Sequence, residues 1–99
     1  MLFVWFAESC GGTLYHYRDN SGLEIDAIIE MRNGAWGAFE IKLGEHQVDN
    51  AVKSLLRLRD KTAAAGAEHP VCLCVVTGGG YGRKREDGIY VIPVNAFAP

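Results

Sequence analysis

The sequence lacks any long apolar run, any strong excess of one charge and any recognisable export signal. No stretch approaches the roughly 18 apolar residues that mark a membrane-spanning helix. Ten Lys and Arg residues against twelve Asp and Glu residues give a formal net charge of −2. Proteins that bind nucleic acid without sequence preference are usually basic overall, so any such role must come from a local site. The apolar start at residues 1–7 has neither a basic lead nor a small-residue cleavage pattern, which argues against a signal peptide.

Cysteine is scarce, and its spacing suits neither a disulfide framework nor a zinc site. The three cysteines, Cys10, Cys72 and Cys74, are an odd number and form no CxxC pair. No histidine lies at zinc-finger spacing from them. Cys72 and Cys74 lie two residues apart in an apolar run, so we expect both to face one side of a strand as small buried residues. This usage is typical of a reducing compartment and predicts a cytoplasmic protein.

A phosphate-binding P-loop is also missing. The glycine-rich segment 78–84 lacks the Gly-Lys-Ser/Thr ending that cradles nucleotide phosphates and holds Mg²⁺. What is present is a chain of 99 residues, 48% apolar and 22% charged, which indicates one folded domain over residues 1–99. Because the chain opens on an apolar run with no helix cap, we expect it to be a fragment of a longer protein.

The hydrophobic periodicity predicts an α/β fold with a mixed sheet flanked by helices. A helical spacing of apolar residues marks a long helix that Gly66 ends. A continuous apolar run up to Thr77 indicates a strand buried on both faces, and residues 78–88 are expected to form a mobile loop. The predicted order is α-β-β-β-α-β-β: a helix at 2–10, strands at 14–18, 24–31 and 35–43, a helix at 45–65, and strands at 71–77 and 89–94.

The second and third strands form a hairpin whose loop length follows from their alternation. A two-residue turn at Asn33 and Gly34 would set the apolar face of one strand beside the polar face of the other. A three-residue loop over residues 32–34, with Gly34 in the left-handed conformation, avoids this conflict. The resulting register pairs Met31 with Ala35, Asp26 with Glu40, and Glu24 with Lys42.

The same alternation predicts which side of the hairpin is buried. Side chains alternate with period two along a strand, so residues of one parity share a face. The odd-numbered residues are mostly apolar and are expected to form one core face, whereas the even-numbered residues are more polar. The odd set comprises Ile25, Ala27, Ile29, Met31, Ala35, Gly37, Phe39, Ile41 and Leu43; the even set comprises Glu24, Asp26, Ile28, Glu30, Trp36, Ala38, Glu40 and Lys42.

This register places two carboxylates opposite each other beside a lysine. Asp26 and Glu40 would repel each other if left bare, and a divalent cation between them would remove the conflict. Hard cations such as Mg²⁺ take carboxylate oxygens, backbone carbonyls and water, and the carbonyl of Ile41 is close by. Lys42 would then stand beside a metal-bound water, which it could orient, or it could stabilise phosphate charge. The simpler alternative is a solvated strand face, with Glu24 as the ion-pair partner of Lys42 rather than a further ligand.

Asp26, followed on the next strand by Glu40-Ile41-Lys42, resembles the PD-(D/E)XK nuclease superfamily. The core of that superfamily is a helix, a three-stranded meander, a second helix and a further strand. Nearly the whole chain is more narrowly similar to the C-terminal nuclease-like domain, of unknown function, of a family of bacterial and archaeal P-loop ATPases. Ile25 stands where the name of the superfamily has proline. The matching segments are residues 14–19, 22–26, 39–42 and 87–93.

The resemblance implies that Asp26 and Glu40 bind a Mg²⁺ or Mn²⁺ ion and that Lys42 assists catalysis. Many members also use an acidic residue on the first helix, a position for which Glu8 is the candidate here. Gln47 opens the helix after the motif and could touch a scissile phosphate, or it could simply be exposed in the first helical turn.

Two further features leave alternatives open. Arg83, Lys84 and Arg85 form a tight basic run with Tyr81 nearby. The run could contact a nucleic-acid backbone, or it could be a solvated loop tip, because acidic residues follow at once. Trp36 could face a partner or cover the second face of the sheet.

Two functions from different classes therefore fit the sequence. The first is a nuclease that hydrolyses DNA with a metal-activated water, in which Asp26, Glu40 and Ile41 hold the ion and Lys42 places the nucleophile. The second is a non-catalytic interaction or regulatory module of an ATPase, which the net charge of −2 favours. The expected partners are DNA, an N-terminal ATPase domain absent from this chain, or a second copy in a homodimer.

Overall fold

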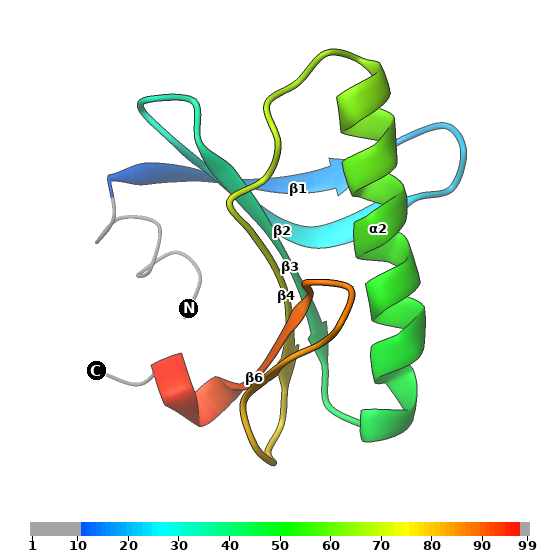
Figure 1. Ribbon diagram of the computed structural model, residues 1–99, viewed down its shortest axis with the longest axis vertical. Helices are drawn as coiled ribbons and strands as arrows, with labels where there is room; N and C mark the ends of the chain where they lie inside the picture. The colour runs from blue at the N-terminus through cyan, green and yellow to red at the C-terminus, as the bar shows by residue number, and fades with distance from the viewer. Residues whose placement is uncertain (1–10, 98–99) are drawn as a thin grey trace.

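The computed structural model describes residues 11–97, which form a six-stranded mixed sheet with one long helix against one face (Figure 1). The strand order is β1-β2-β3-β4-β6-β5. The first three strands are an antiparallel meander, β4 joins β3 in parallel after the helix, and β6 lies parallel to β4 with β5 antiparallel beside it. The elements are β1 (Gly12–Arg18), β2 (Glu24–Met31), β3 (Trp36–Lys42), η1 (Glu45–Gln47), α2 (Val48–Ala64), β4 (Cys72–Thr77), β5 (Arg83–Lys84), β6 (Tyr90–Pro93) and η2 (Val94–Phe97).

The order of elements differs from the predicted order in two respects. Over residues 11–97 the order is β-β-β-α-β-β-β, and α2 is the one α-helix there, so two flanking helices are not found in this part of the chain. The helix predicted at residues 2–10 lies outside the described residues. The additional strand is β5, two exposed residues within a segment predicted as loop. Two residues carry no alternation that could reveal an edge strand.

The long helix forms where its apolar spacing predicts it. η1 leads directly into α2, and Gly66 follows with φ of +83°, the left-handed conformation typical of the residue just past a helix end. The helix predicted at residues 45–65 is therefore confirmed. Among residues 11–97 no helix combines the length and hydrophobicity that a membrane crossing requires. The side chains that α2 buries are Val48, Ala51, Val52, Leu55 and Leu58.

The β2–β3 turn has the geometry that the alternation predicts. Gly34 has φ of +90°, and the Met31 N–H closes the loop by donating to the Ala35 carbonyl at 2.7 Å. The ladder beyond it, as far as the pair of Ala27 and Phe39, has the register of a three-residue loop. The predicted register is confirmed over these pairs.

The prediction that the odd-numbered residues of the hairpin share one core face is confirmed for Ala27, Ile29, Met31 and Phe39. It is wrong for Ile25, which lies on the other face, and for Ile41 and Leu43, which are exposed. Ile25 is buried beneath α2, whereas Ala27 packs on the opposite face of the sheet. The cause is a bulge in the β1–β2 pairing. The two-residue step from Tyr15 to Tyr17 opposes the three-residue step from Ile28 to Ile25. The extra residue reverses the alternation along β2.

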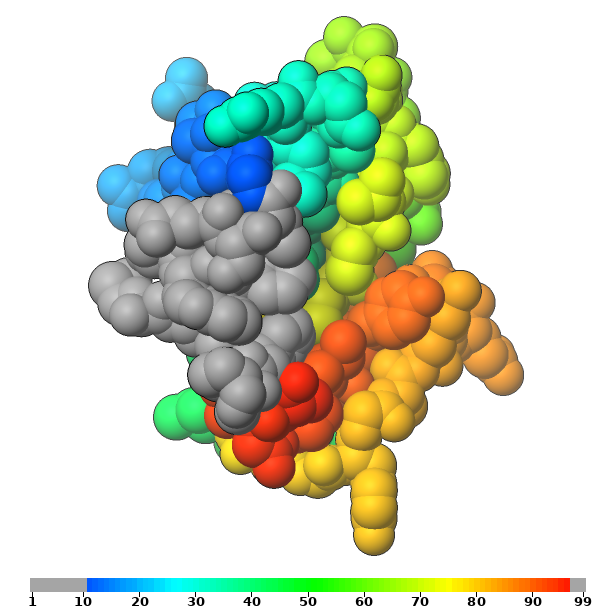
Figure 2. Space-filling view, turned by 90° about the vertical axis from the view of Figure 1, so that its left-hand side faces the viewer, coloured from blue at the N-terminus to red at the C-terminus, as the bar shows by residue number. Residues whose placement is uncertain are grey.

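The central strands are buried on both faces. In β3, Trp36 packs beneath α2 and Phe39 packs on the opposite face, so Trp36 covers the second face of the sheet. In β4, Cys72 and Cys74 share the face opposite α2, as expected, while Leu73 packs beneath the helix. Figure 2 views the molecule from the side away from α2. β4 has parallel neighbours on both sides, and strands in that position are commonly covered on both faces of the sheet.

Candidate metal centre

Regular pairing between β2 and β3 gives way at the acidic site to bonds between side chains and backbone. The ladder runs as far as Ala27 and Phe39. Beyond it, the Asp26 N–H donates to Glu40 Oε1 at 2.8 Å, and the Ile41 N–H donates to Asp26 Oδ2 at 2.8 Å. Each carboxylate therefore accepts a backbone N–H from the neighbouring strand. This reciprocal exchange holds the two acidic side chains side by side.

The bulge in β2 explains how Asp26 reaches across to β3. Asp26 lies between Ile25 and Ala27, which pack on opposite faces of the sheet, so the side chain of Asp26 falls where the alternation reverses. Bulges commonly re-aim a side chain in this way. Asp26 is exposed, while its partner Glu40 is buried. The site therefore has one acidic group in contact with solvent and one behind it.

Glu40 is an acidic residue in an unfavourable environment for its charge. The residue is only 4% exposed. Burial raises the pKa of the Glu40 carboxyl above its ordinary value, and the negative charge of Asp26 raises it further. The Asp26 N–H and the ammonium of Lys42, whose Nζ lies 3.8 Å from Glu40 Oε2, act in the opposite direction. A cation at this position would stabilise the charged form of Glu40.

The available donors suit a hard divalent cation that keeps much of its water. One oxygen of each carboxylate accepts a backbone N–H. The remaining oxygens are Asp26 Oδ1 and Glu40 Oε2, and the latter lies 3.8 Å from Lys42 Nζ. The backbone of Ile41 is held against Asp26 by the second of these two N–H bonds. Mg²⁺ is often held by one or two carboxylates and several waters. Within residues 11–97, His, Cys, Asp and Glu side chains form no group of three or more that could make a fuller cage.

Lys42 has a polar neighbour that the sequence analysis did not single out. It pairs with Thr77 in the parallel β3–β4 ladder. Thr77 is buried, and its Oγ1 donates to the Gly79 carbonyl at 3.0 Å. This bond fixes the start of the glycine-rich loop beside the candidate centre. A polar residue at the end of an apolar strand, just before three glycines, was the signal that could have identified it.

The accessory residues have other partners. Arg18 Nε donates to Glu24 Oε1 at 2.6 Å, so the predicted pairing of Glu24 with Lys42 is wrong. Because the β2–β3 ladder stops before Glu24, the residue directly opposite it is Arg18 of β1. Gln47 Oε1 accepts the Gly44 N–H at 3.3 Å at the start of η1. Glu8 lies outside the described residues.

The basic run comprises β5 and the residue after it, and ion pairs join it to the first turns of the helix. Arg83 Nη2 lies 2.7 Å from Glu45 Oε1, and Arg85 Nη1 lies 3.2 Å from Asp49 Oδ1. Lys84 Nζ lies 5.4 Å from the ring centre of the tyrosine in β6. The Arg83 and Glu45 side chains are largely exposed, so their pair adds little stability. Both ion pairs nevertheless compete with any phosphate for the two arginines.

Comparison with known proteins identifies a family and leaves its function open. No curated protein and no solved structure matches the chain. A family model described as a domain of unknown function, DUF4143, matches residues 5–97. The match spans every described strand and the whole candidate metal centre. The chain therefore belongs to the DUF4143 family of domains of unknown function.

Proposed function

We propose that this DUF4143 domain is a metal-dependent nuclease of the PD-(D/E)XK, restriction-endonuclease-like kind that hydrolyses phosphodiester bonds in DNA. The observation that carries the proposal is the reciprocal pair of hydrogen bonds by which Asp26 and Glu40 each bind the opposite strand. With Lys42 3.8 Å from Glu40, two carboxylates and an ammonium gather where β2 and β3 stop pairing. The meander, the long helix and the parallel strand after it agree with the core of that superfamily.

The two carboxylates and the neighbouring backbone have the role of ion ligands in this proposal. Asp26 and Glu40 hold Mg²⁺ or Mn²⁺, and the Ile41 carbonyl is a further oxygen donor. When bound, the ion supplies an activated water and offsets phosphate charge. The reciprocal N–H bonds orient both carboxylates in advance, as groups behind metal ligands commonly do, which reduces the rearrangement that binding requires.

Lys42 has the role of positioning the nucleophile and stabilising charge. Its side chain is 31% exposed, so the ammonium can reach a substrate at the surface. The 3.8 Å separation from Glu40 Oε2 is longer than a hydrogen bond, so that carboxylate does not hold the ammonium tightly. An ammonium here can orient the attacking water and stabilise the negative charge that develops on the phosphate.

A second candidate function, a non-catalytic interaction or regulatory module of an ATPase, is favoured by the distribution of charge. The net charge is −2. Arg83 and Arg85 of the basic run are already paired with Glu45 and Asp49. Under this alternative the domain binds an N-terminal ATPase domain or a second copy of itself, and the acidic pair is a remnant of a nuclease site.

Calorimetric titration with Mn²⁺ and Mg²⁺ tests the metal site without assuming a substrate. We expect the double variant Asp26→Asn with Glu40→Gln to lose metal binding, because it removes both charged ligands with little change of shape. The control double variant Asp60→Asn with Glu86→Gln removes the same two kinds of charge from exposed positions and should bind as the wild type does. An equal loss in both double variants would contradict a specific site.

Cleavage of DNA then separates the two candidate functions. Lys42→Ala should retain Mn²⁺ binding and lower the cleavage rate by about 100-fold or more, the usual effect of removing a group that stabilises transition-state charge. Cleavage at the wild-type rate by this variant would remove Lys42 from the proposal. Metal binding without any cleavage by the wild type, together with binding to the ATPase domain, would favour the interaction module.

A further inference from the structure

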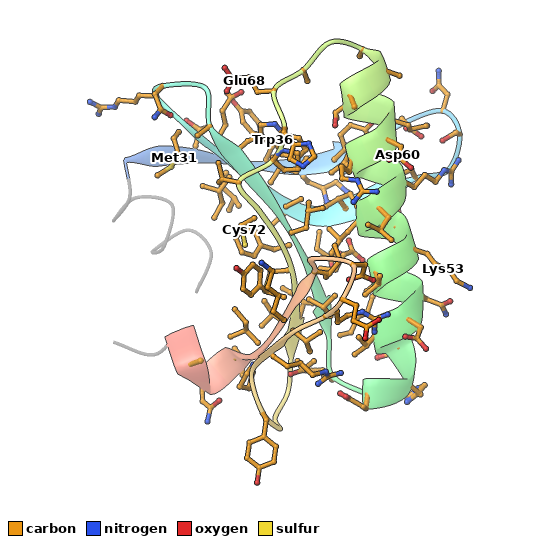
Figure 3. All side chains as sticks on the ribbon, viewed as in Figure 1. Met31, Trp36, Lys53, Asp60, Glu68 and Cys72 are labelled. Carbon is orange, nitrogen blue, oxygen red and sulfur yellow. The ribbon has the colours of Figure 1, made fainter. Side chains whose placement is uncertain are left out.

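A cavity of about 410 Å³ opens between α2 and the sheet, at the hairpin end of the β2–β3 ladder. The candidate metal centre lies at the other end of the same ladder. In Figure 3, Trp36 lies between the sheet and the helix, and Glu68 lies on the chain that follows the helix. The side chains that give the cavity its chemistry are three aromatic and two acidic ones: Tyr15, Tyr17, Trp36, Glu30 and Glu68.

The strand register and a few hydrogen bonds hold these walls in place. Glu30 and Trp36 are direct partners in the β2–β3 ladder. The Tyr15 hydroxyl donates to Glu30 Oε1 at 3.2 Å, and Trp36 Nε1 donates to the Glu68 carbonyl at 2.8 Å. The Trp36 bond fixes the chain after α2 against β3, so the acidic side chain of Glu68 stays at the cavity. Walls that are set before binding favour affinity, because little order has to be imposed by the ligand.

The charged side chains that line the cavity are both acidic. Its lining includes no Lys, Arg or His. Within residues 11–97 neither Glu30 nor Glu68 has an ion-pair partner. Arg57 and Lys61 of α2 bind the β1–β2 turn instead. The negative charge of Glu30 is felt by its neighbour, since it raises the pKa of the Tyr15 hydroxyl.

We propose that this cavity binds an organic cation that carries a guanidinium group. Aromatic rings attract cations, and unpaired carboxylates add charge-assisted hydrogen bonds. A guanidinium is planar, stacks on aromatic rings and presents five N–H donors, whereas a lysine ammonium is compact and more strongly hydrated. The combination of three aromatic and two acidic side chains therefore favours an arginine-like group. The site is separate from the metal centre, and the proposal does not depend on nuclease activity.

The Trp36 indole N–H provides the readout, because it forms one of the bonds at the cavity wall. The full 99-residue chain, labelled with ¹⁵N, is titrated with N-acetylarginine amide and, as a neutral control of the same shape, N-acetylcitrulline amide. We expect the arginine compound to bind about tenfold more tightly or better, with N-acetyllysine amide in between, because the site selects positive charge first and planarity second. Equal binding of the arginine and citrulline compounds would overturn the proposal.

Two double variants test whether the acidic side chains are responsible. Glu30→Gln with Glu68→Gln should abolish the preference for arginine over citrulline, and the same spectra report whether the variant is folded. Asp60→Asn with Glu86→Gln removes two negative charges outside the cavity and should keep the preference. A loss of preference in both variants would overturn the proposal, since net charge alone would then explain binding.

The source of the guanidinium is decided by a further comparison. Agmatine carries the group as a free small molecule, and a Gly-Arg-Gly peptide presents it as a protein partner would. Tighter binding of the peptide supports an arginine of a partner protein as the occupant, and tighter or equal binding of agmatine supports a free guanidino compound. Failure of both to shift the Trp36 resonance at millimolar concentration would overturn the proposal.

Discussion

At the scale of single residues, Glu40 shows that the candidate site lowers the stability of the fold. A carboxylate that is 4% exposed and lies beside Asp26 is costly to ionise, which is why its pKa is raised. An apolar or amide side chain would fill the same space without that cost. Proteins tolerate such residues where function requires them, so the energetic disadvantage of Glu40 itself points to a site.

We expect Glu40→Gln to raise the free energy of unfolding by about 0.5–2 kcal/mol near neutral pH. The amide can still accept the Asp26 N–H but carries no charge to bury. Because the Glu40 pKa is higher in the folded than in the unfolded chain, the wild type loses stability as pH rises through the folded pKa. The advantage of the variant should therefore vanish below about pH 4, where the carboxyl is neutral in both states.

Urea denaturation across this pH range measures the effect. The exposed Glu86→Gln should change stability little at any pH and serves as the control. A Glu40→Gln variant that is less stable than the wild type at pH 8 would show that the charge of Glu40 is favourable where it lies. Addition of Mn²⁺ should reverse the order, because the ion stabilises only the chain that retains the Glu40 carboxylate.

The sequence predicted which residues form the candidate site, but it did not predict the hydrogen bonds between them. The alternation along the hairpin and Gly34 predict that Asp26 and Glu40 are neighbours, and in the structure they lie just beyond the last ladder pair, Ala27 with Phe39. The exchange of N–H bonds between them depends on a bulge that arises in the pairing of β1 with β2. No local pattern in β2 marks that extra residue, because a bulge is a property of two strands together.

At the scale of elements, the register of β2 and β3 depends on the backbone conformation of the turn between them. Gly34 has φ of +90°, which a residue with a Cβ adopts only at a cost. The positive φ lets a three-residue loop close with Met31 bonded to Ala35. The same turn that sets the hairpin thereby sets which carboxylates meet at its far end.

We expect Gly34→Ala to lower the free energy of unfolding by about 1–2 kcal/mol, the cost of a left-handed conformation for an L-residue. Space is available for the methyl group, since the nearest atom to a Cβ there, an oxygen of Glu68, is 3.9 Å away. Gly79→Ala is the matched control, because Gly79 has open space and no positive φ. Equal losses in the two variants, measured by urea denaturation, would contradict a role for the turn conformation.

The features that were not predicted are those that depend on contacts with other elements of the fold. The long helix and the buried β4 were predictable because both carry long apolar patterns. β5 has two exposed basic residues, and it forms a strand only because β6 offers an edge to pair with. Both faces of β3 are likewise buried because α2 covers one of them. No pattern within residues 36–42 indicates that a helix packs there.

At the scale of the whole molecule, acidic groups on the helix restrain the basic run. Glu45 and Asp49 lie at the start of the helix and engage Arg83 and Arg85 across the fold. This arrangement joins the outer edge of the sheet to the helical layer. It also lowers the positive potential that a nucleic-acid backbone would meet, and so bears directly on the choice between the two candidate functions.

If the domain acts on DNA, removal of the helix carboxylates that pair with Arg83 and Arg85 should strengthen binding. Glu45→Gln with Asp49→Asn frees Arg83 for phosphate contacts and removes one of the two carboxylate partners of Arg85, whose Nε stays 3.2 Å from Asp87 Oδ2. Each added phosphate contact steepens the dependence of log affinity on log salt by about 0.9. We therefore expect tighter binding at low salt and a slope steeper by about 1, measured by fluorescence anisotropy with a labelled duplex. Asp60→Asn with Glu86→Gln changes the net charge equally and should leave the slope near that of the wild type, because it frees neither arginine of the run. Equal slopes for the two double variants would assign the gain to net charge, and absence of binding in all three proteins would leave the interaction module as the better account of this fold.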